Sequence, residues 1–244
     1  MFERIKEDVD AAFQNDPAAR SKLEVILCYP GVHALLLHRI SHYLWKKGLF
    51  LLARLISHAN RFLTGIEIHP AAEIGRGVFI DHGMGVVIGE TAVVGDGCLI
   101  YKGVVLGGTT TEKTKRHPTL GKKIIVGSNA CILGNITIGD YVRIGSGSVV
   151  VKDVPPHATV VGVPGRIIEQ KKKEHDVMLD HGQLPDPIAE ALKVVLKENR
   201  KLKQRIKKLE DNLNLSSDED DYVSEAESEV MTVFMKNYKD GDGI

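Results

Sequence analysis

The hydrophobic positions between Ile68 and Pro155 recur with a period of six residues. Neither a helix, with a period of 3.6 residues, nor an alternating strand, with a period of two, gives this spacing. A parallel β-helix does, because each hexapeptide forms one side of a coil and stacks on the side below. Twelve aliphatic residues follow this six-residue period, here called the hexapeptide beat, with a single two-residue slip after Ile80. Such regularity argues against chance in a chain rich in Ile, Val and Gly. They are Ile68, Ile74, Ile80, Ile88, Val94, Ile100, Leu106, Val126, Ile132, Ile138, Ile144 and Val150.

Three hexapeptides close one triangular coil, so the repeat predicts about four coils. We place this β-helix at 65–168. A polar stretch interrupts it and is expected to leave the prism as a loop at 107–120, which is a usual place for function on a rigid scaffold. Two Pro-containing segments, 152–156 and 161–166, are expected to end the stack and to cover its strand edges.

Residues 1–64 have helical rather than hexapeptide spacing and predict a small N-terminal helical domain. Breaks are expected at Asn15-Asp16-Pro17 and at Tyr29-Pro30-Gly31, because Pro does not continue a helix. The four expected helices cover 2–13, 18–28, 33–47 and 49–63.

A heptad pattern starts at Pro187 and predicts a coiled-coil helix within a segment at 169–215. Its basic residues suggest nucleic-acid binding, but the intact apolar seam favours a solvated coiled-coil face. A trimer fits, because triangular β-helices pack about a threefold axis. Asn199 lies on the seam and would fix the register of the strands. The seam residues are Ile188, Leu192, Val195, Asn199, Leu202, Ile206, Leu209 and Leu213.

Composition excludes several classes of protein. The net charge of +0 gives no global field to attract nucleic acid. Three cysteines cannot all pair, which favours a reduced, cytoplasmic protein. There is no apolar signal core and no run of membrane-spanning length, so we expect no membrane association. The acidic residues 216–244 predict a disordered tail.

The candidate chemistry centres on His82, which follows Asp81 at a predicted coil corner. Glu67 precedes it by close to one coil, so stacking is expected to place this carboxylate beside the imidazole. Such a pair fixes the tautomer of a general base. Arg116 and His117 lie on the loop, which can fold back over an edge of the prism.

The alternatives for these residues are a satisfied surface histidine and a metal site. Zinc bound by three histidines would need a third ligand beside His82 and His117, and the residue five after His117 is Lys122. We therefore expect no metal. The backbone N–H groups of Gly107-Gly108-Thr109 are expected to bind oxygens of an extended ligand at a coil corner.

Nine motifs together resemble serine O-acetyltransferase, a hexapeptide-repeat acyltransferase family that makes O-acetylserine from L-serine and acetyl-CoA. The resemblance implies a mainly β fold, with a left-handed parallel β-helix. The motifs are Asp16–Ala18, Gly31–Leu35, Ile68–Ala72, Ile80–His82, Gly89–Ala92, Leu106–Thr109, Arg116–Pro118, Ile132–Asn135 and Gly162–Pro164.

The resemblance also implies roles for the candidate residues. His82 takes the proton of the serine hydroxyl, Glu67 orients it although the family often has Asp there, and His117 lies beside the hydroxyl or the oxyanion. Transfer is direct, since no Cys or Ser lies beside His82 as an enzyme nucleophile. Asp16 and Asp81 hold the serine amino group, and Arg116 its carboxylate. Acetyl-CoA, a co-substrate and not a permanently bound cofactor, lies between two subunits against Gly108, Thr109, Ser128 and Ser146.

The resemblance implies partners as well. We expect a homotrimer, because the chain begins shortly before Asp16, whereas members with longer helical domains form hexamers. Asp242, Gly243 and Ile244 resemble the tail that docks into O-acetylserine sulfhydrylase, and L-cysteine is the expected feedback inhibitor. Two alternatives stay open: a β-helix acyltransferase that acts on a sugar, and a weakly active scaffold that regulates a sulfhydrylase through its tail.

Overall fold

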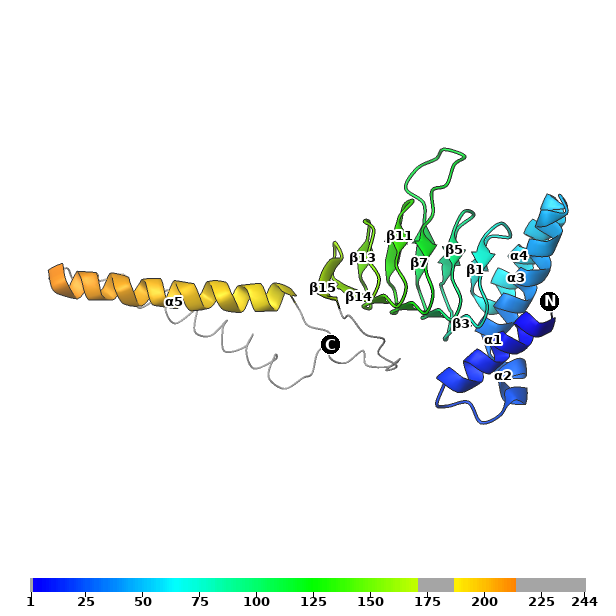
Figure 1. The fold of residues 1–244 in the computed structure, drawn as a ribbon, viewed down its shortest axis with the longest axis horizontal. Coiled ribbons are helices and arrows are strands. Elements are labelled where there is room, and N and C mark those ends of the chain that lie inside the picture. Colours follow the sequence, from blue (N-terminus) through cyan, green and yellow to red (C-terminus); the bar gives the residue numbers. More distant parts are fainter. Residues whose placement is uncertain (1, 171–186, 214–244) are drawn as a thin grey trace. The chain divides into compact units, whose positions relative to one another are not determined.

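The structure is a computed structural model that describes residues 2–170 and 187–213. They belong to two units, Met1–Asp186 and Pro187–Ile244. The first unit has helices at one end and stacked strands over the rest (Figure 1). Its helices are α1 (Phe2–Asn15), α2 (Lys22–Cys28), α3 (Pro30–Lys46) and α4 (Phe50–Thr64).

Local chemistry explains where these helices differ from the predicted ranges. The second helix starts four residues later than predicted, because the Ser21 side chain caps it by accepting a hydrogen bond from the Glu24 N–H at 3.1 Å. The third begins at Pro30, inside the predicted break, because Pro suits the first turn of a helix. Gly65, with a φ of 71°, ends α4 in the left-handed conformation.

The hexapeptide segment forms three parallel sheets, one for each side of a triangular coil. Strands that are neighbours in a sheet lie one coil apart, so Ile88 of β4 pairs with Ile68 of β1 on one side and with Leu106 of β7 on the other. Sheet A holds β1 (Glu67–Ile68), β4 (Val87–Ile88), β7 (Val105–Gly107), β10 (Cys131–Leu133) and β13 (Val149–Val150). Sheet B holds β2 (Glu73–Ile74), β5 (Val93–Val94), β8 (Thr119–Leu120) and β11 (Thr137–Ile138). Sheet C holds β3 (Phe79–Ile80), β6 (Leu99–Ile100), β9 (Ile125–Val126), β12 (Arg143–Ile144), β14 (Ala158–Val161) and β15 (Arg166–Gln170).

The predicted parallel β-helix with N-terminal helices is confirmed. All twelve aliphatic residues of the hexapeptide beat belong to one buried cluster inside the prism. The stack is longer than the predicted four coils, because sheet A alone has five strands. Val154 bridges to Ile138, β14 continues sheet C, and β15 then pairs antiparallel with β14 and ends the stack.

The helices are fixed to the first coil by apolar packing and by a buried ion pair. α1 and α3 pack against β3, and α4 packs against β1. The Arg39 guanidinium on α3 donates to both carboxylate oxygens of Asp8 on α1, at 2.8 and 2.9 Å, and to the carbonyl of Gly75 at 3.0 Å. A pair this deeply buried needs both partners, so it fixes the relative positions of α1, α3 and the coil.

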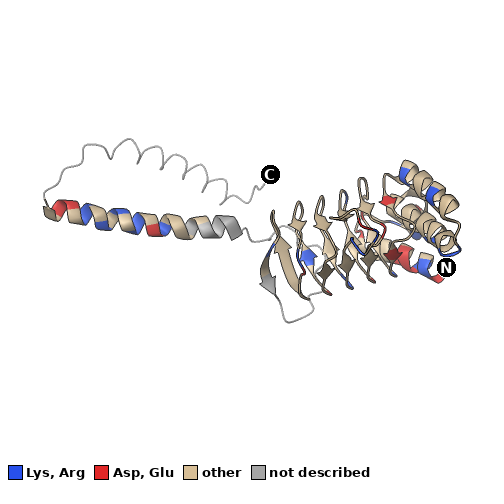
Figure 2. Ribbon diagram, turned by 90° about the horizontal axis from the view of Figure 1, so that it is seen from above, with Lys and Arg blue, Asp and Glu red and all other residues tan. Residues whose placement is uncertain are grey.

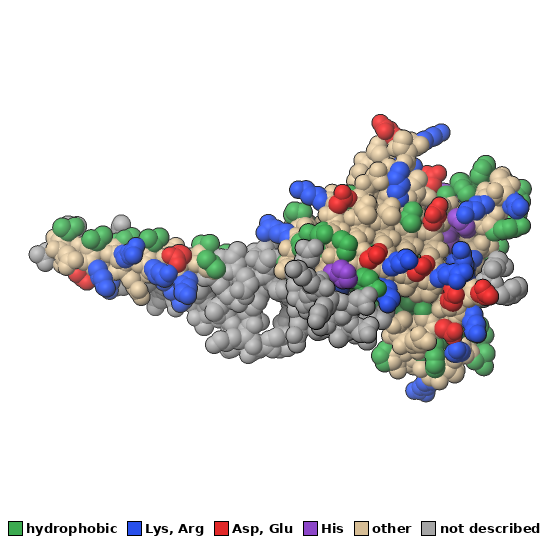
Figure 3. All heavy atoms as spheres, viewed as in Figure 1, with side chains coloured by type: hydrophobic (Ala, Val, Ile, Leu, Met, Phe, Trp, Pro, Cys, Tyr) green, Lys and Arg blue, Asp and Glu red, His purple; other side chains and the backbone are tan. Residues whose placement is uncertain are grey.

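The second unit contains the helix α5 (Pro187–Leu213), which covers the predicted heptad segment. Figure 2 shows basic residues spread along α5, and Figure 3 shows hydrophobic side chains gathered along one side of it. The seam residues at Leu192, Val195, Leu202, Ile206, Leu209 and Leu213 are all exposed.

Within the described residues, no single helix is long and apolar enough to cross a membrane. The pair α2 and α3, bent by 69°, meets the same criterion by length and composition only. The predicted tail at 216–244 lies outside the described residues.

Candidate active site

Most of the candidate residues lie at two of the three edges of the coil stack; Asp16 lies in the helical domain and Glu67 in β1. The chain turns from sheet C to sheet A at one edge, here called the C–A edge, and from sheet A to sheet B at the A–B edge. The polar loop projects from the A–B edge between β7 and β8 (Figure 1). The C–A edge carries Asp81, His82, Ser128 and Ser146, and the A–B edge carries Gly108, Thr109, Arg116 and His117.

His82 lies at an enlarged corner of the C–A edge. The two-residue slip of the hexapeptide beat falls here, between β3 and β4. His82 has a φ of 58°, in the left-handed region that residues with a side chain rarely adopt. Its side chain is 75% exposed in the single chain, and its Nε2 lies 3.8 Å from the Asp81 carboxylate. The imidazole is therefore open to a substrate and next to a negative charge.

A second carboxylate reaches this corner from the helical domain. Asp16 follows α1, which packs against β3, the strand that ends directly before Asp81. Burial raises the pKa of Asp81; the neighbouring His82 opposes this rise and Asp16 adds to it. Two carboxylates that repel each other favour a cation between them, such as the ammonium group of an amino acid.

The close approach of α3 to β3 depends on Gly31. A Cβ added at Gly31 would lie 2.1 Å from the carbonyl oxygen of Ile80, a distance that no real Cβ contact allows. Gly31 is the second residue of α3, and Ile80 is the last residue of β3. The start of α3 and the corner that carries Asp81 and His82 are thus packed backbone to backbone.

In the single chain, the Glu67 carboxylate does not lie beside the His82 imidazole, where stacking predicts it. Its carboxylate forms an ion pair with Arg61 of α4 at 3.2 Å. Within the described residues, the carboxylate within 4 Å of the His82 ring is that of Asp81. The packing of α4 against β1 brings Arg61 beside Glu67. The two extra residues of the corner at His82 also change the alignment of His82 with the coil below.

At the A–B edge, Thr91 anchors the returning end of the loop. Its Oγ1 accepts hydrogen bonds from the backbone N–H groups of Arg116 and His117, at 3.0 and 3.1 Å. Its carbonyl oxygen accepts one from the Lys115 Nζ at 2.5 Å. Its own N–H donates to His117 Nδ1 at 3.2 Å. One residue therefore fixes three consecutive loop residues on the coil.

These contacts define the tautomer of His117. A backbone N–H can only donate, so Nδ1 is an acceptor and the proton of the neutral ring is on Nε2. Burial lowers the pKa of His117, and the charges of Arg116 and Lys115 lower it further against the opposing effect of Glu90. The ring is buried against Gly89. His117 is thus a neutral N–H donor.

Arg116 is held by a neighbour that sequence reasoning did not assign. Its guanidinium forms an ion pair with Glu90 at 2.5 Å, and the hydrogen bond from Arg116 lowers the pKa of Glu90. Neither Glu90 nor Thr91 has a role that their sequence pattern predicted. The long loop hid the signal, since Val93 pairs with the residues that follow the loop, so Glu90 and Thr91 lie one coil below its end.

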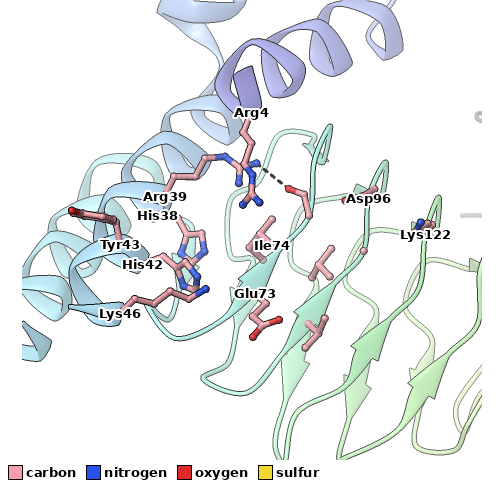
Figure 4. A pocket seen from close by; sticks show the side chains of 14 residues that line it. Arg4, His38, Arg39, His42, Tyr43, Lys46, Glu73, Ile74, Asp96 and Lys122 are labelled. Carbon is pink, nitrogen blue, oxygen red and sulfur yellow. Dashed lines mark hydrogen bonds between the residues drawn. The ribbon is translucent and has the colours of Figure 1, made fainter. Parts of the chain in front are cut away.

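A separate cavity of about 580 Å³ lies between α3 and sheet B (Figure 4). Its walls include His38, His42 and Lys46 of α3, with Ile74 and Val94 on the sheet. None of the candidate site residues lines it, so it is not the candidate active site. Within residues 2–170 and 187–213, no group of three or more His, Cys, Asp or Glu side chains could hold a metal ion.

Stacked hexapeptide coils with an imidazole at one edge and a loop-borne His-Arg pair at another define a hexapeptide-repeat acyltransferase. Comparison with known proteins gives the family. A serine acetyltransferase of Synechococcus elongatus is 54% identical over 213 residues, which are 87% of this chain and 84% of that protein. One of Bacillus pumilus is 53% identical over 86% of this chain and 96% of its own length. This chain belongs to the serine acetyltransferase family, as its motifs indicated.

Solved structures agree with this assignment. A serine acetyltransferase of Neisseria gonorrhoeae in complex with serine is 43% identical, with a TM-score of 0.67 over 69% of both chains. A serine acetyltransferase in complex with cysteine is 40% identical, with a TM-score of 0.69 over 70% of this chain and 66% of that one. No family model matches the chain.

Proposed function

We infer that this chain transfers the acetyl group of acetyl-CoA to the hydroxyl of L-serine, giving O-acetylserine and CoA in the biosynthesis of cysteine. The observation that carries this conclusion is the identity of more than half of the aligned residues to serine acetyltransferases across most of the chain. The neighbours solved with serine and with cysteine support serine and cysteine as small-molecule ligands of this chain.

The geometry supports a direct transfer with His82 as general base. The His82 ring accepts the proton of the serine hydroxyl while the oxygen attacks the acetyl carbonyl carbon. Collapse of the tetrahedral intermediate breaks the carbon–sulfur bond, and the imidazolium returns the proton to the CoA sulfur. The Nε2–H of His117 is suited to donate to the hydroxyl or to the oxyanion.

The two edges are brought together by a second copy of the chain. Both the C–A edge and the A–B edge border sheet A. If three copies turn sheet A toward a threefold axis, the C–A edge of each copy meets the A–B edge of the next. We therefore propose a homotrimer in which His82 and His117 of one site come from different copies. The finer geometry of the family, a left-handed coil, belongs to the same proposal.

The proposed contacts of the substrates follow from this arrangement. Asp16 and Asp81 hold the ammonium group of serine, and Arg116 of the next copy turns from Glu90 to the serine carboxylate. Acetyl-CoA lies along the seam between the copies. Its expected contacts are Ser128 and Ser146 on one side and Gly108 and Thr109 on the other.

The activity is tested by mixing the chain with acetyl-CoA and L-serine and measuring the release of free thiol. We expect release with the wild type and a large loss with Asp16→Ala at low serine concentration, because one of two carboxylates for the ammonium group is removed. Acetylation of a sugar that is unaffected by Asp16→Ala would favour the sugar acyltransferase. Absence of thiol release with retained sulfhydrylase binding would favour the scaffold.

We propose that α5 helices of the same trimer form a parallel coiled coil. With Leu192, Asn199 and Ile206 at position a, the residues at g and e are Glu198 with Lys203, and Arg205 with Glu210. In a parallel, in-register bundle each pair is attractive. Deleting 187–244 is expected to raise the protein concentration at which half of the trimer dissociates on dilution, measured by analytical ultracentrifugation, whereas an unchanged midpoint would exclude a role of α5 in assembly.

We propose that the C-terminal residues Asp242, Gly243 and Ile244 dock into the active site of O-acetylserine sulfhydrylase. Support comes from the sequence, in which a hydrophobic C-terminal residue follows an acidic tether. Deletion of Ile244 is expected to abolish binding to the sulfhydrylase in calorimetry and to leave acetyl transfer unchanged. Binding that survives the deletion would show that the tail is not the contact.

A further inference from the structure

The Asp16 carboxylate is held on both of its oxygens. Oδ1 accepts a hydrogen bond from the N–H of Ala18 at 2.8 Å, within the turn that links α1 to α2. Oδ2 accepts one from the hydroxyl of Tyr29 at 2.5 Å. The hydrogen bond from Ala18 is local in sequence, whereas the one from Tyr29 comes from the residue that lies between α2 and α3. Tyr29 therefore ties Asp16 to a different part of the helical domain.

Tyr29 is itself rigidly placed. It links the end of α2 to the start of α3, where its N–H donates to the Val25 carbonyl and its carbonyl accepts from the N–H of Val32. Pro30 restricts its backbone to the extended region, in which it is found. Its ring packs on the buried cluster that includes Val25, Val32 and Phe79 of β3. The hydroxyl is thus presented from a fixed support.

The electrostatics favour this hydroxyl as a permanent donor. Burial raises the pKa of Tyr29 above its ordinary value, and its hydrogen bond to Asp16 and the charges of Asp16, Glu24 and Asp81 raise it further. A hydroxyl that stays protonated remains a donor to Asp16 and so fixes the orientation of its carboxylate. An oriented Asp16 carboxylate is suited to bind an ammonium group.

We propose that Tyr29 is a positioning residue for the amino-acid substrate: it acts through Asp16, whose carboxylate it holds aimed at the ammonium group. This proposal rests on the proposed function, in which Asp16 and Asp81 bind that group. Asp81 is fixed by the backbone of the coil, whereas Asp16 lies on a turn of the helical domain. Tyr29 therefore controls how well the two carboxylates act together.

The test is steady-state kinetics of Tyr29→Phe, which removes only the hydroxyl. The KM for L-serine is expected to rise about tenfold, because a hydrogen bond to a charged group is lost. The inhibition constant of L-cysteine should rise in parallel. The kcat at saturating serine and the KM for acetyl-CoA should stay within about twofold, since Tyr29 touches neither the acetyl group nor CoA. Tyr43→Phe, on the exposed side of α3, is the matched control and should change none of these constants.

Three outcomes overturn the proposal. An unchanged KM for serine in Tyr29→Phe would show that Asp16 needs no orientation by the hydroxyl. A joint loss of kcat, of both KM values and of thermal stability would show a purely structural role. A wild type that does not acetylate L-serine would instead overturn the proposed function and this inference with it, which distinguishes the two failures.

Discussion

Replacement of His82 with Ala is expected to lower kcat/KM for acetyl transfer to serine by about 10²- to 10⁴-fold, the range for loss of a general base. The ring lies exposed at its corner, so its removal should not change the fold. The measurement is thiol release at fixed acetyl-CoA, with circular dichroism to verify the fold. His58→Ala, an exposed histidine on α4, is the control and should retain wild-type activity.

A complementation experiment tests whether the site is shared between copies. Co-assembly of equal amounts of the His82→Ala and His117→Ala chains would restore intact sites at interfaces where each copy supplies its remaining histidine. Random mixing in a cyclic trimer gives about a quarter of all sites intact. Activity no greater than the sum of the separate variants would contradict a site built from two copies.

Replacement of Gly31 with Ala is expected to destabilise the first unit by about 1–3 kcal/mol, as overpacking does. The sign of this change in stability is informative, because replacing Gly with Ala inside a helix normally stabilises it by about 1 kcal/mol. Here the new Cβ would meet the carbonyl oxygen of Ile80 at 2.1 Å, so α3 must move away from β3. Urea unfolding of the two proteins measures the difference.

The same substitution should also raise the KM for serine. Moving the start of α3 carries Tyr29 away from Asp16, since Tyr29 directly precedes the helix. Equal or greater stability of Gly31→Ala would mean that the contact between α3 and β3 relaxes without cost. A lower stability with an unchanged KM would separate packing of the helix from orientation of Asp16.

The period of the hydrophobic residues was sufficient to predict the coil stack, because the core of the stack is repetitive. Each aliphatic residue of the beat repeats the environment of the one a coil below, so one misassigned residue would leave the others in place. The helix boundaries depend on single contacts, such as the Ser21 cap, and were less accurate. The extra coil was missed because Leu120 was assigned to the loop at 107–120 and Val154 follows Val150 by four residues instead of six. Its third aliphatic residue, Val160, is separated from the repeat by Pro155 and Pro156.

The candidate site was predictable in its residue types and less so in its pairings. Asp81 and His82 adjoin in sequence, and Arg116 and His117 adjoin on the loop, so each pair was evident. Partners that are distant in sequence were not evident. The two-residue slip after Ile80 and the long loop change which residues lie above one another in successive coils. Glu67 consequently pairs with Arg61, and Thr91 emerges as the anchor of His117 only in three dimensions.

The attachment of the loop at Thr91 has a consequence for how this chain tolerates change. Lys115, Arg116 and His117 are each hydrogen-bonded directly to Thr91 on the coil. Their positions therefore do not depend on the length of the loop before them. Insertions, tags or altered sequences around Thr110 and Glu112 can accumulate there while the imidazole keeps its place. We therefore expect this part of the loop to tolerate changes of length and sequence at little catalytic cost.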